Sequence, residues 1–279
     1  MAKMRIIADN AAERCTITTS TTAGALVAAN LQTNDKAKVA RSTAGTTWTI
    51  SGSTATTETA SCAHLPFCNL SPTATIRVRL YSDTAGTVLV LDTNTLQPGA
   101  LACPAPARKP RGWTAAQAAS AYANGGGAHA RIWLAPTGFR KFVIDIADTN
   151  NLQGYIEAAG AVVVGTYWEA EYGPTGVQLQ VTDSTTTYRN AAGGQMADAG
   201  TIHRRVPIVL GYLNSADRAR FMGLIMDSRA YPILVSVFPG HADLSLERDF
   251  TVYGRRPDDS DITYQFAGAY GSKVEVEEI

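Results

Sequence analysis

The chain has 279 residues, a formal net charge of zero and only 17% charged residues, which argues against a basic nucleic-acid-binding face. Hydrophobic residues make up 45% of it, which excludes a disordered chain, and its length is comfortable for two domains. A weakly charged exterior favours association and suits a subunit packed against neighbours. No stretch near the N-terminus is apolar enough for a signal peptide, so we expect assembly in a cytoplasm.

Short β-strands separated by turns are predicted for the first part of the chain. Residues 5–8, 15–19 and 46–50 are rich in β-branched and apolar side chains, and a Ser-Gly-Ser turn follows the third run. In residues 74–81 apolar and polar side chains alternate, a pattern that is typical of a half-buried strand. Residues 87–91 then complete a hairpin.

The alternation stops in a Pro/Gly/Ala-rich loop, residues 96–128. Residues 113–122 are rich in alanine and predict one short helix, with Thr114 as its N-cap. A loop of this length inside a compact domain usually has a function or contacts a neighbouring subunit. Strands are predicted again for residues 130–134 and 141–148.

The second half of the chain predicts a sheet crossed by one helix. The predicted strands are residues 176–182, 185–189, 203–210, 231–238, 250–253, 262–266 and 273–277. The helix spans residues 215–228, with Asn214 or Ser215 as its cap. One face of this helix holds Ala219, Met222, Ile225 and Met226. Pro207 indicates that its strand lies at an edge or a bulge.

Motifs that would indicate catalysis or cofactor binding are missing. The sequence holds no phosphate-binding loop, no Gly-x-Ser-x-Gly elbow and no His-Glu-x-x-His helix. One metal candidate is Cys62, His64 and Cys68, with Cys15 or Cys103 as a fourth ligand. Their spacing lacks the tight Cys-x-x-Cys of zinc knuckles, so we interpret the cysteines as free buried thiols. We expect no enzyme, no cofactor and no metal site.

An aromatic and acidic cluster offers the one candidate for glycan chemistry. Glu169 and Glu171 lie between Trp168 and Tyr172, and on a strand two such residues would share one face. A carboxylate pair for glycoside hydrolysis is therefore one interpretation. The interpretation that we favour is a solvated strand edge whose aromatic residues contact another subunit.

Several short runs resemble a known module in the same order along the chain. Residues 28–31 (Ala-Ala-Asn-Leu), 38–42 (Lys-Val-Ala-Arg-Ser) and 48–52 (Trp-Thr-Ile-Ser-Gly) resemble the opening of the galactose-binding-like jelly roll of phage tail proteins. Residues 69–78 resemble its next piece, and residues 142–158 resemble its closing strands and exit. Together the runs are similar to distal tail or baseplate proteins of siphovirus-type phages.

The resemblance implies a fold class, a function and partners. The fold class would be all-β dominated with one helix: a jelly-roll-like β-sandwich in residues 1–160, then a tail-tube-like β-sandwich or barrel in residues 161–279. The function would be that of a virion structural protein, a hexameric ring that joins the tail tube to the distal tip or baseplate. Its partners would be copies of itself, the tail tube protein, and the tape measure and tail hub proteins. Its localisation would be the virion tail.

The alternative is a carbohydrate-binding host-recognition protein of the tail tip, whose partner is a host surface glycan. The candidate residues for glycan or subunit contact are Trp113, Trp133, Trp168 and Tyr172. We expect no specific nucleic-acid binding. We also expect no membrane insertion, because the most apolar window, residues 206–210, is far too short to span a bilayer.

Overall fold

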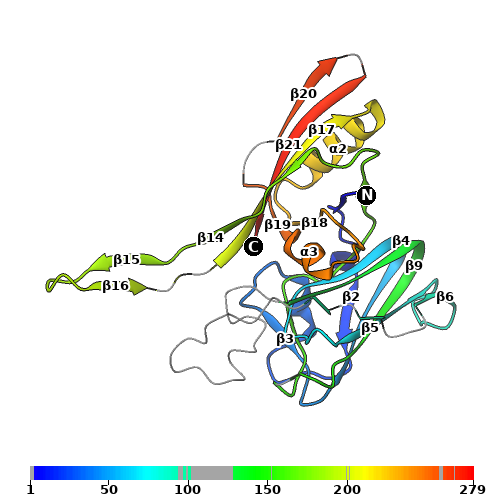
Figure 1. Ribbon diagram of the computed structural model, residues 1–279. Coiled ribbons are helices and arrows are strands. Elements are labelled where there is room, and N and C mark those ends of the chain that lie inside the picture. The colour runs from blue at the N-terminus through cyan, green and yellow to red at the C-terminus, as the bar shows by residue number, and fades with distance from the viewer. Residues whose placement is uncertain are drawn as a thin grey trace.

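A computed structural model describes residues 3–93, 97–98, 100–101, 128–151, 153–198, 200, 202–257, 260–266 and 268–279. Two β-sheets dominate it, and a thin arm projects from one of them (Figure 1). The predicted fold class, dominated by β-structure with a packed helix in the second half, is confirmed. Most of the predicted loop 96–128, including the predicted helix at residues 113–122, lies outside the described residues.

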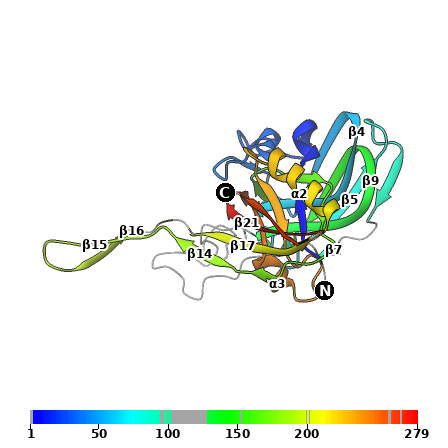
Figure 2. The ribbon, with the colours of Figure 1, turned by 90° about the horizontal axis from the view of Figure 1, so that it is seen from above.

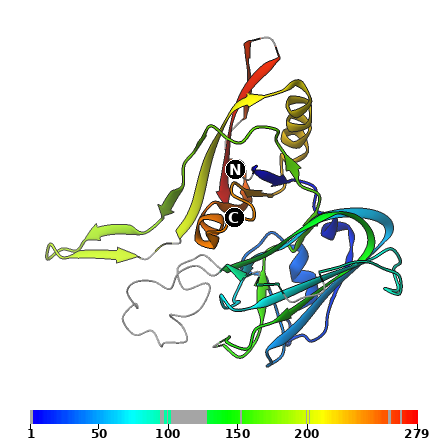
Figure 3. The ribbon, with the colours of Figure 1, turned by 45° about the vertical axis from the view of Figure 1, so that its right-hand side comes forward.

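The first sheet is built around two long antiparallel strands. Its described strands are β2 (Thr16–Thr19), β3 (Val39–Arg41), β4 (Thr47–Cys68), β5 (Thr75–Tyr81), β6 (Leu89–Asp92), β7 (Gln97–Pro98), β8 (Ala100–Leu101), β9 (Ala128–Ala147), β10 (Glu157–Ala159) and β11 (Val163–Gly165). The central order is β3-β10-β4-β9-β5-β6. Strands β4 and β9 pair from Thr47↔Ala147 to Cys68↔Ala128 with three register shifts. These irregularities accompany the bend that folds the sheet over its own core (Figure 3).

The predicted Ser-Gly-Ser turn after residue 50 is wrong, because strand β4 continues through it. Packing explains why a glycine stands inside a strand here. The ring of Phe142, which is fully buried, occupies the space where a side chain at position 52 would lie. The glycine therefore serves close packing between β4 and β9, whereas its sequence context indicates a turn.

The second sheet has the order β12-β1-β18-β19-β21-β17-β13, with β14 on β17 and β20 on β21. Its described strands are β1 (Arg5–Ile7), β12 (Trp168–Glu169), β13 (Gly176–Val177), β14 (Gln180–Asp183), β17 (Ile202–Leu213), β18 (Ile233–Ser236), β19 (Thr251–Arg255), β20 (Asp261–Phe266) and β21 (Ala269–Glu278). The domain limits 1–160 and 161–279 stay a prediction. Strand β1, however, pairs with β12 and β18 in this second sheet, and Met4 and Ile6 enter its core.

In the described residues, four helical segments accompany the sheets. They are the 3-10 turns η1 (Ala11–Arg14) and η2 (Ala28–Gln32) and the helices α2 (Ser215–Asp227) and α3 (Leu244–Asp249). Helix α2 is the predicted helix, and the side chain of Asn214 caps it by accepting from the Asp217 amide at 2.7 Å. Helix α3 has no counterpart in the sequence analysis. None of the helices in the described part of the chain is long and apolar enough to cross a membrane.

The predicted apolar face of α2 is only partly the face that the sheet buries: Ile225 packs against the core, whereas Ala219, Met222 and Met226 are exposed. Phe221 and Leu224 enter the core, and Phe221 stacks on Trp168 with ring centroids 5.5 Å apart. Met222 and Met226 remain 45% and 59% exposed. The helix therefore has a second apolar face that nothing in the described structure covers.

The arm, residues 180–198, extends the second sheet away from the body (Figures 1 and 2). It begins at β14 and ends in a hairpin of β15 (Thr186–Arg189) and β16 (Gln195–Asp198), and every residue of these three strands is exposed. Gly193, with a positive φ of 79°, closes the turn by donating its amide proton to Asn190.

Candidate interaction site

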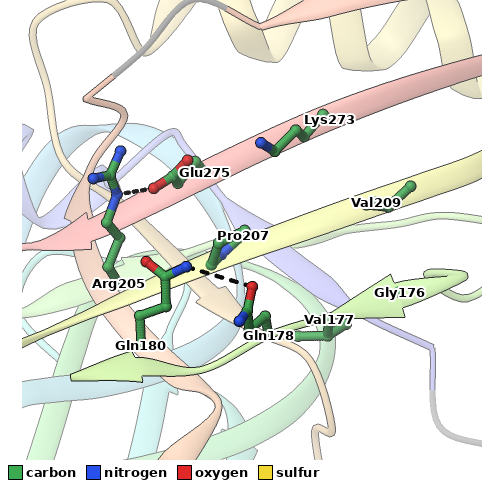
Figure 4. Close-up of a pocket in the computed structure, with 9 residues that line it drawn as sticks. All are labelled: Gly176, Val177, Gln178, Gln180, Arg205, Pro207, Val209, Lys273 and Glu275. Carbon is green, nitrogen blue, oxygen red and sulfur yellow. Dashed lines mark hydrogen bonds and ion pairs between the residues drawn. The ribbon is translucent and has the colours of Figure 1, made fainter.

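A shallow hollow of about 500 Å³ lies at the root of the arm, over β13, β14, β17 and β21 (Figure 4). Its lining consists of Gly176, Val177, Gln178, Gln180, Arg205, Pro207, Val209, Lys273 and Glu275. Pro207 lies where the partner of β17 changes from β13 to β14, and its carbonyl accepts from the Gln178 amide at 3.0 Å. The missing N–H of proline therefore faces the interruption between β13 and β14. The predicted edge or bulge at Pro207 is wrong, because β17 pairs on both sides and its register shift lies between Leu210 and Leu213.

Polar and apolar residues share the lining of the hollow. Arg205 forms an ion pair with Glu275, and Gln180 Nε2 donates to Gln178 Oε1 at 3.4 Å. Lys273 adds an exposed ammonium group. The lining contains no serine, cysteine or histidine, so this hollow lacks a nucleophile with an adjacent base. Its amides and charges suit contact with the polar surface of a partner.

One face of the arm carries an apolar pair next to a carboxylate. In the register of β15 and β16, Tyr188 lies opposite Met196 and Thr186 lies opposite Asp198. Since alternate residues of a strand share a face, Tyr188, Met196 and Asp198 lie on one side of the hairpin. Tyr188 and Met196 are 48% and 47% exposed. The hairpin thus presents an apolar surface to solvent with no cover from its own chain among the described residues.

The two sheets are joined by a buried ion pair. Glu247 of α3 is fully buried, and its Oε1 accepts from Arg131 Nε of β9 at 2.8 Å and from Trp133 Nε1 at 3.0 Å. The second carboxylate oxygen contacts Arg131 Nη2. Sequence analysis missed Arg131 and Glu247, because 116 residues separate them and neither belongs to a motif.

An apolar cluster surrounds these polar contacts between the sheets. Ile7, Leu234 and Tyr253 come from the second sheet, whereas Cys62 and Phe67 come from the first. A further hydrogen bond of 2.6 Å runs from Tyr253 Oη to Asn34 Oδ1. Burial of this cluster together with the ion pair makes the two sheets a single packed body.

The four candidate contact residues have different surroundings. Trp133 is half-buried between the sheets, where the Arg5 guanidinium lies 4.9 Å from its ring centroid. Trp168 is half-buried under α2. Tyr172 is 49% exposed and packs edge-on against Tyr212 at 4.7 Å. Trp113 lies outside the described residues. The proposed contacts of these residues stay predictions, and Tyr172 is the member of the described three with the most open ring.

Each carboxylate of the glycosidase alternative already has a partner. Glu169 Oε2 accepts from Arg5 Nε at 2.9 Å. Glu171 contacts Asn214 Nδ2 through Oε2, and its backbone amide donates to Asp217. Strand β12 ends at Glu169, so the assumption that both carboxylates share one strand face does not hold.

The cysteines and histidines of the metal candidate lie in separate surroundings. Cys15 and Cys62 are free buried thiols, as expected, and Cys68 is also buried, whereas Cys103 lies outside the described residues. Cys68 Sγ donates to the Ala128 carbonyl at 3.3 Å in the core of the first sheet, and Cys62 packs between the sheets. No group of three or more His, Cys, Asp or Glu residues that could hold a metal occurs in the described ranges.

A pair of buried histidines lies near the Arg131–Glu247 contact. The rings of His64 and His129 are 5.0 Å apart, and both nitrogens of His64 lack a hydrogen-bond partner among the described residues. Burial, with a smaller effect of Arg131, lowers the pKa of His64 to about 3. Burial also lowers the pKa of His129, and the charges of its neighbours, His64 first, add to this effect. Both rings are therefore neutral near pH 7.

Comparisons with known proteins return a distant likeness. No protein-family model and no curated protein matches the chain. The CBM32 of AlyQ in complex with 4,5-unsaturated mannuronic acid is 11% identical over 53% of this chain and 92% of its own, with a TM-score of 0.32. Truncated AlyQ with CBM32 and alginate lyase domains is 12% identical over 84% of this chain, with a TM-score of 0.34. The match spans 48% of that second structure's chain. Likeness at this level carries no conclusion about what this chain binds.

Proposed function

We propose that the protein is a structural subunit that assembles with copies of itself, and that its assembly is a ring at the tip of a phage tail. The observation that carries the proposal is the arm. Its three strands are exposed along their whole length and extend away from both cores. An isolated two-stranded hairpin is marginally stable in water, so a partner surface would stabilise it.

The body has the rigidity that such a subunit needs. The buried pair of Arg131 and Glu247 and the apolar cluster around Tyr253 hold the two sheets together. An arm on a rigid body meets a neighbour at a fixed angle, and fixed angles are what closed symmetric assemblies require. The ring and its place in a tail come from the sequence resemblance, and the assembly itself is what the geometry supports.

Sedimentation velocity of the purified full chain tests this proposal. The wild-type protein is expected to form a species larger than one subunit. A variant in which a Gly-Ser linker replaces residues 185–198 is expected to be a monomer with an unchanged circular dichroism signal from the body. A wild-type protein that remains monomeric at high concentration would overturn the proposal.

A second candidate function is glycan binding, and Tyr172 is the observation in its favour. Its open ring beside Tyr212 offers a face on which a sugar can stack, and Glu171 supplies a nearby acceptor for hydroxyl groups. A glycan array that includes uronate oligosaccharides would detect such binding. Loss of binding in Tyr172→Ala, with retention in Tyr231→Ala as a control of similar exposure, would support this function. No binding to any probe would count against it.

A further inference from the structure

We infer that the arm of one subunit docks on the outer face of helix α2 of the next subunit. This inference rests on the proposed function and names the surface that receives the arm. The outer face of α2 consists of Ala219, Met222, Gly223 and Met226, all exposed. These positions recur at the spacing of one helix face, so they form a continuous apolar stripe.

The arm has a shape and chemistry that fit this stripe. Ala219 and Gly223 leave a shallow strip beside two methionines, and a hairpin with one large ring can lie along it. The thioethers of Met222 and Met226 are flexible and make favourable contacts with aromatic rings. Tyr188 and Met196 of the arm provide a ring and a matching thioether on one face of the hairpin.

Charge favours the same pairing. Asp198 lies on the apolar face of the arm and is exposed. Arg220 lies at the margin of the stripe on α2, and Arg229 follows the helix, both exposed. None of the three forms an ion pair with any described residue of its own chain. The margin of the stripe also holds the exposed carboxylate of Asp227, so its two guanidinium groups and one carboxylate leave a net positive charge. An arm with a free carboxylate therefore meets a helix face of opposite net charge.

The positions of the two surfaces determine the type of assembly. The arm projects from one side of the body and α2 lies on the opposite side (Figures 1 and 3). A subunit thus cannot cover its own stripe, and the contact joins two different surfaces of successive copies. Such a head-to-tail contact produces a closed ring when a whole number of the rotations that relate successive copies adds up to one full turn.

Two complementary variants test the docking. Met196→Asp places a carboxylate on the arm face, and Met222→Asp places one on the stripe. Each substitution is expected to raise the protein concentration at which half of the subunits are assembled by about tenfold or more, because the contact would bury an unpaired charge. Val88→Asp is the control, since Val88 is 54% exposed but lies next to β6 of the first sheet. All three variants are expected to keep the wild-type circular dichroism spectrum.

Mixing the two defective variants gives the sharpest outcome. The intact stripe of Met196→Asp can receive the intact arm of Met222→Asp, so an equimolar mixture is expected to form a heterodimer and nothing larger. Wild-type assembly that persists in both single variants would overturn the docking and leave the proposed self-assembly standing. A monomeric wild-type protein would overturn both.

Discussion

Arg131 of strand β9 donates from Nε to Glu247 Oε1 at 2.8 Å, and this contact joins the first sheet to a helix of the second. Glu247 is fully buried, and the side chain of Arg131 is 12% exposed. The pair therefore lies in surroundings where loss of one charge leaves the other without compensation.

Glu247→Gln is expected to destabilise the protein by about 3 kcal/mol, because it leaves the Arg131 charge buried and unpaired. Urea denaturation at pH 7.5 measures this free energy. Asp9→Asn is the control, since Asp9 pairs with Arg14 at the surface and its side chain is 71% exposed. That change is expected to cost less than about 1 kcal/mol. An equal loss of unfolding free energy in the two variants would contradict the claim that buried Glu247 compensates the charge of Arg131.

The histidine pair predicts a loss of stability in acid. Burial holds the pKa of His64 near 3 in the folded state, whereas an unfolded histidine titrates near 6.5. Between these values the unfolded chain binds a proton that the folded chain does not, so stability falls as the pH falls below about 6.5. The slope is roughly 1.4 kcal/mol per pH unit for each such histidine.

Urea denaturation at pH 7.5 and pH 5 checks this slope. His64→Phe keeps an aromatic ring in the pocket and removes the titrating group, so its stability is expected to depend less on pH than that of the wild-type protein. The comparison between the two proteins is needed because buried carboxylates also respond to acid. Glu278 is one of them: burial raises its pKa, but the charge and hydrogen bonds of Arg204 and the charge of Lys36 together lower it below its ordinary value. An identical slope in both proteins would refute the role of His64.

Gly52→Ala tests the close approach of β4 to β9. The added Cβ would overlap the Phe142 ring, so the substitution is expected to destabilise the protein by roughly 1–3 kcal/mol. Gly138→Ala lies in the same strand pair, where the nearest atom to an added Cβ is 3.5 Å away. The Tm of Gly52→Ala should be clearly lower than that of Gly138→Ala. If Gly52→Ala unfolds no earlier than Gly138→Ala, the packing described here is wrong.

Limited proteolysis tests whether the arm is covered on assembly. Arg189 lies in the exposed strand β15, where trypsin can reach it in a free subunit. We expect rapid cleavage after Arg189 in the monomeric variant Met222→Asp and protection in assembled wild-type protein. Mass spectrometry of the fragments identifies the site. Equal cleavage rates in both samples would show that assembly leaves the arm exposed.

The sequence predicted local structure well where side-chain alternation is regular. Strand β5 was expected at residues 74–81 and spans Thr75–Tyr81, and α2 was expected at residues 215–228 and spans Ser215–Asp227. Long-range features escaped prediction. The runs 130–134 and 141–148 belong to one strand, β9, because β4 supports the chain between them. The periodicity of side chains along a sequence contains no information about pairing with a strand that is distant in the chain.

The same limit applies to the sites. Met222 and Met226 are exposed because the opposite face of α2 meets Trp168 and the sheet. The sequence places both methionines on an apolar face of the helix, but it does not show which face of the helix the sheet covers. Glu247 is a single acidic residue in a short helix, and its importance appears only once Arg131 and Trp133 lie beside it. Tyr172 was selected from its neighbours in sequence, and the structure adds the exposed ring face.

Measurement of the particle mass in solution tests the central claim most directly. Sedimentation equilibrium of the wild-type chain over a wide concentration range is expected to give a mass that is a whole multiple of the 29.6 kDa subunit, with six copies as the value that the sequence resemblance implies. The variant with a linker in place of residues 185–198 is expected to sediment as one subunit. A wild-type mass of one subunit at every concentration, or an arm-deleted variant that assembles as the wild type does, would contradict the account.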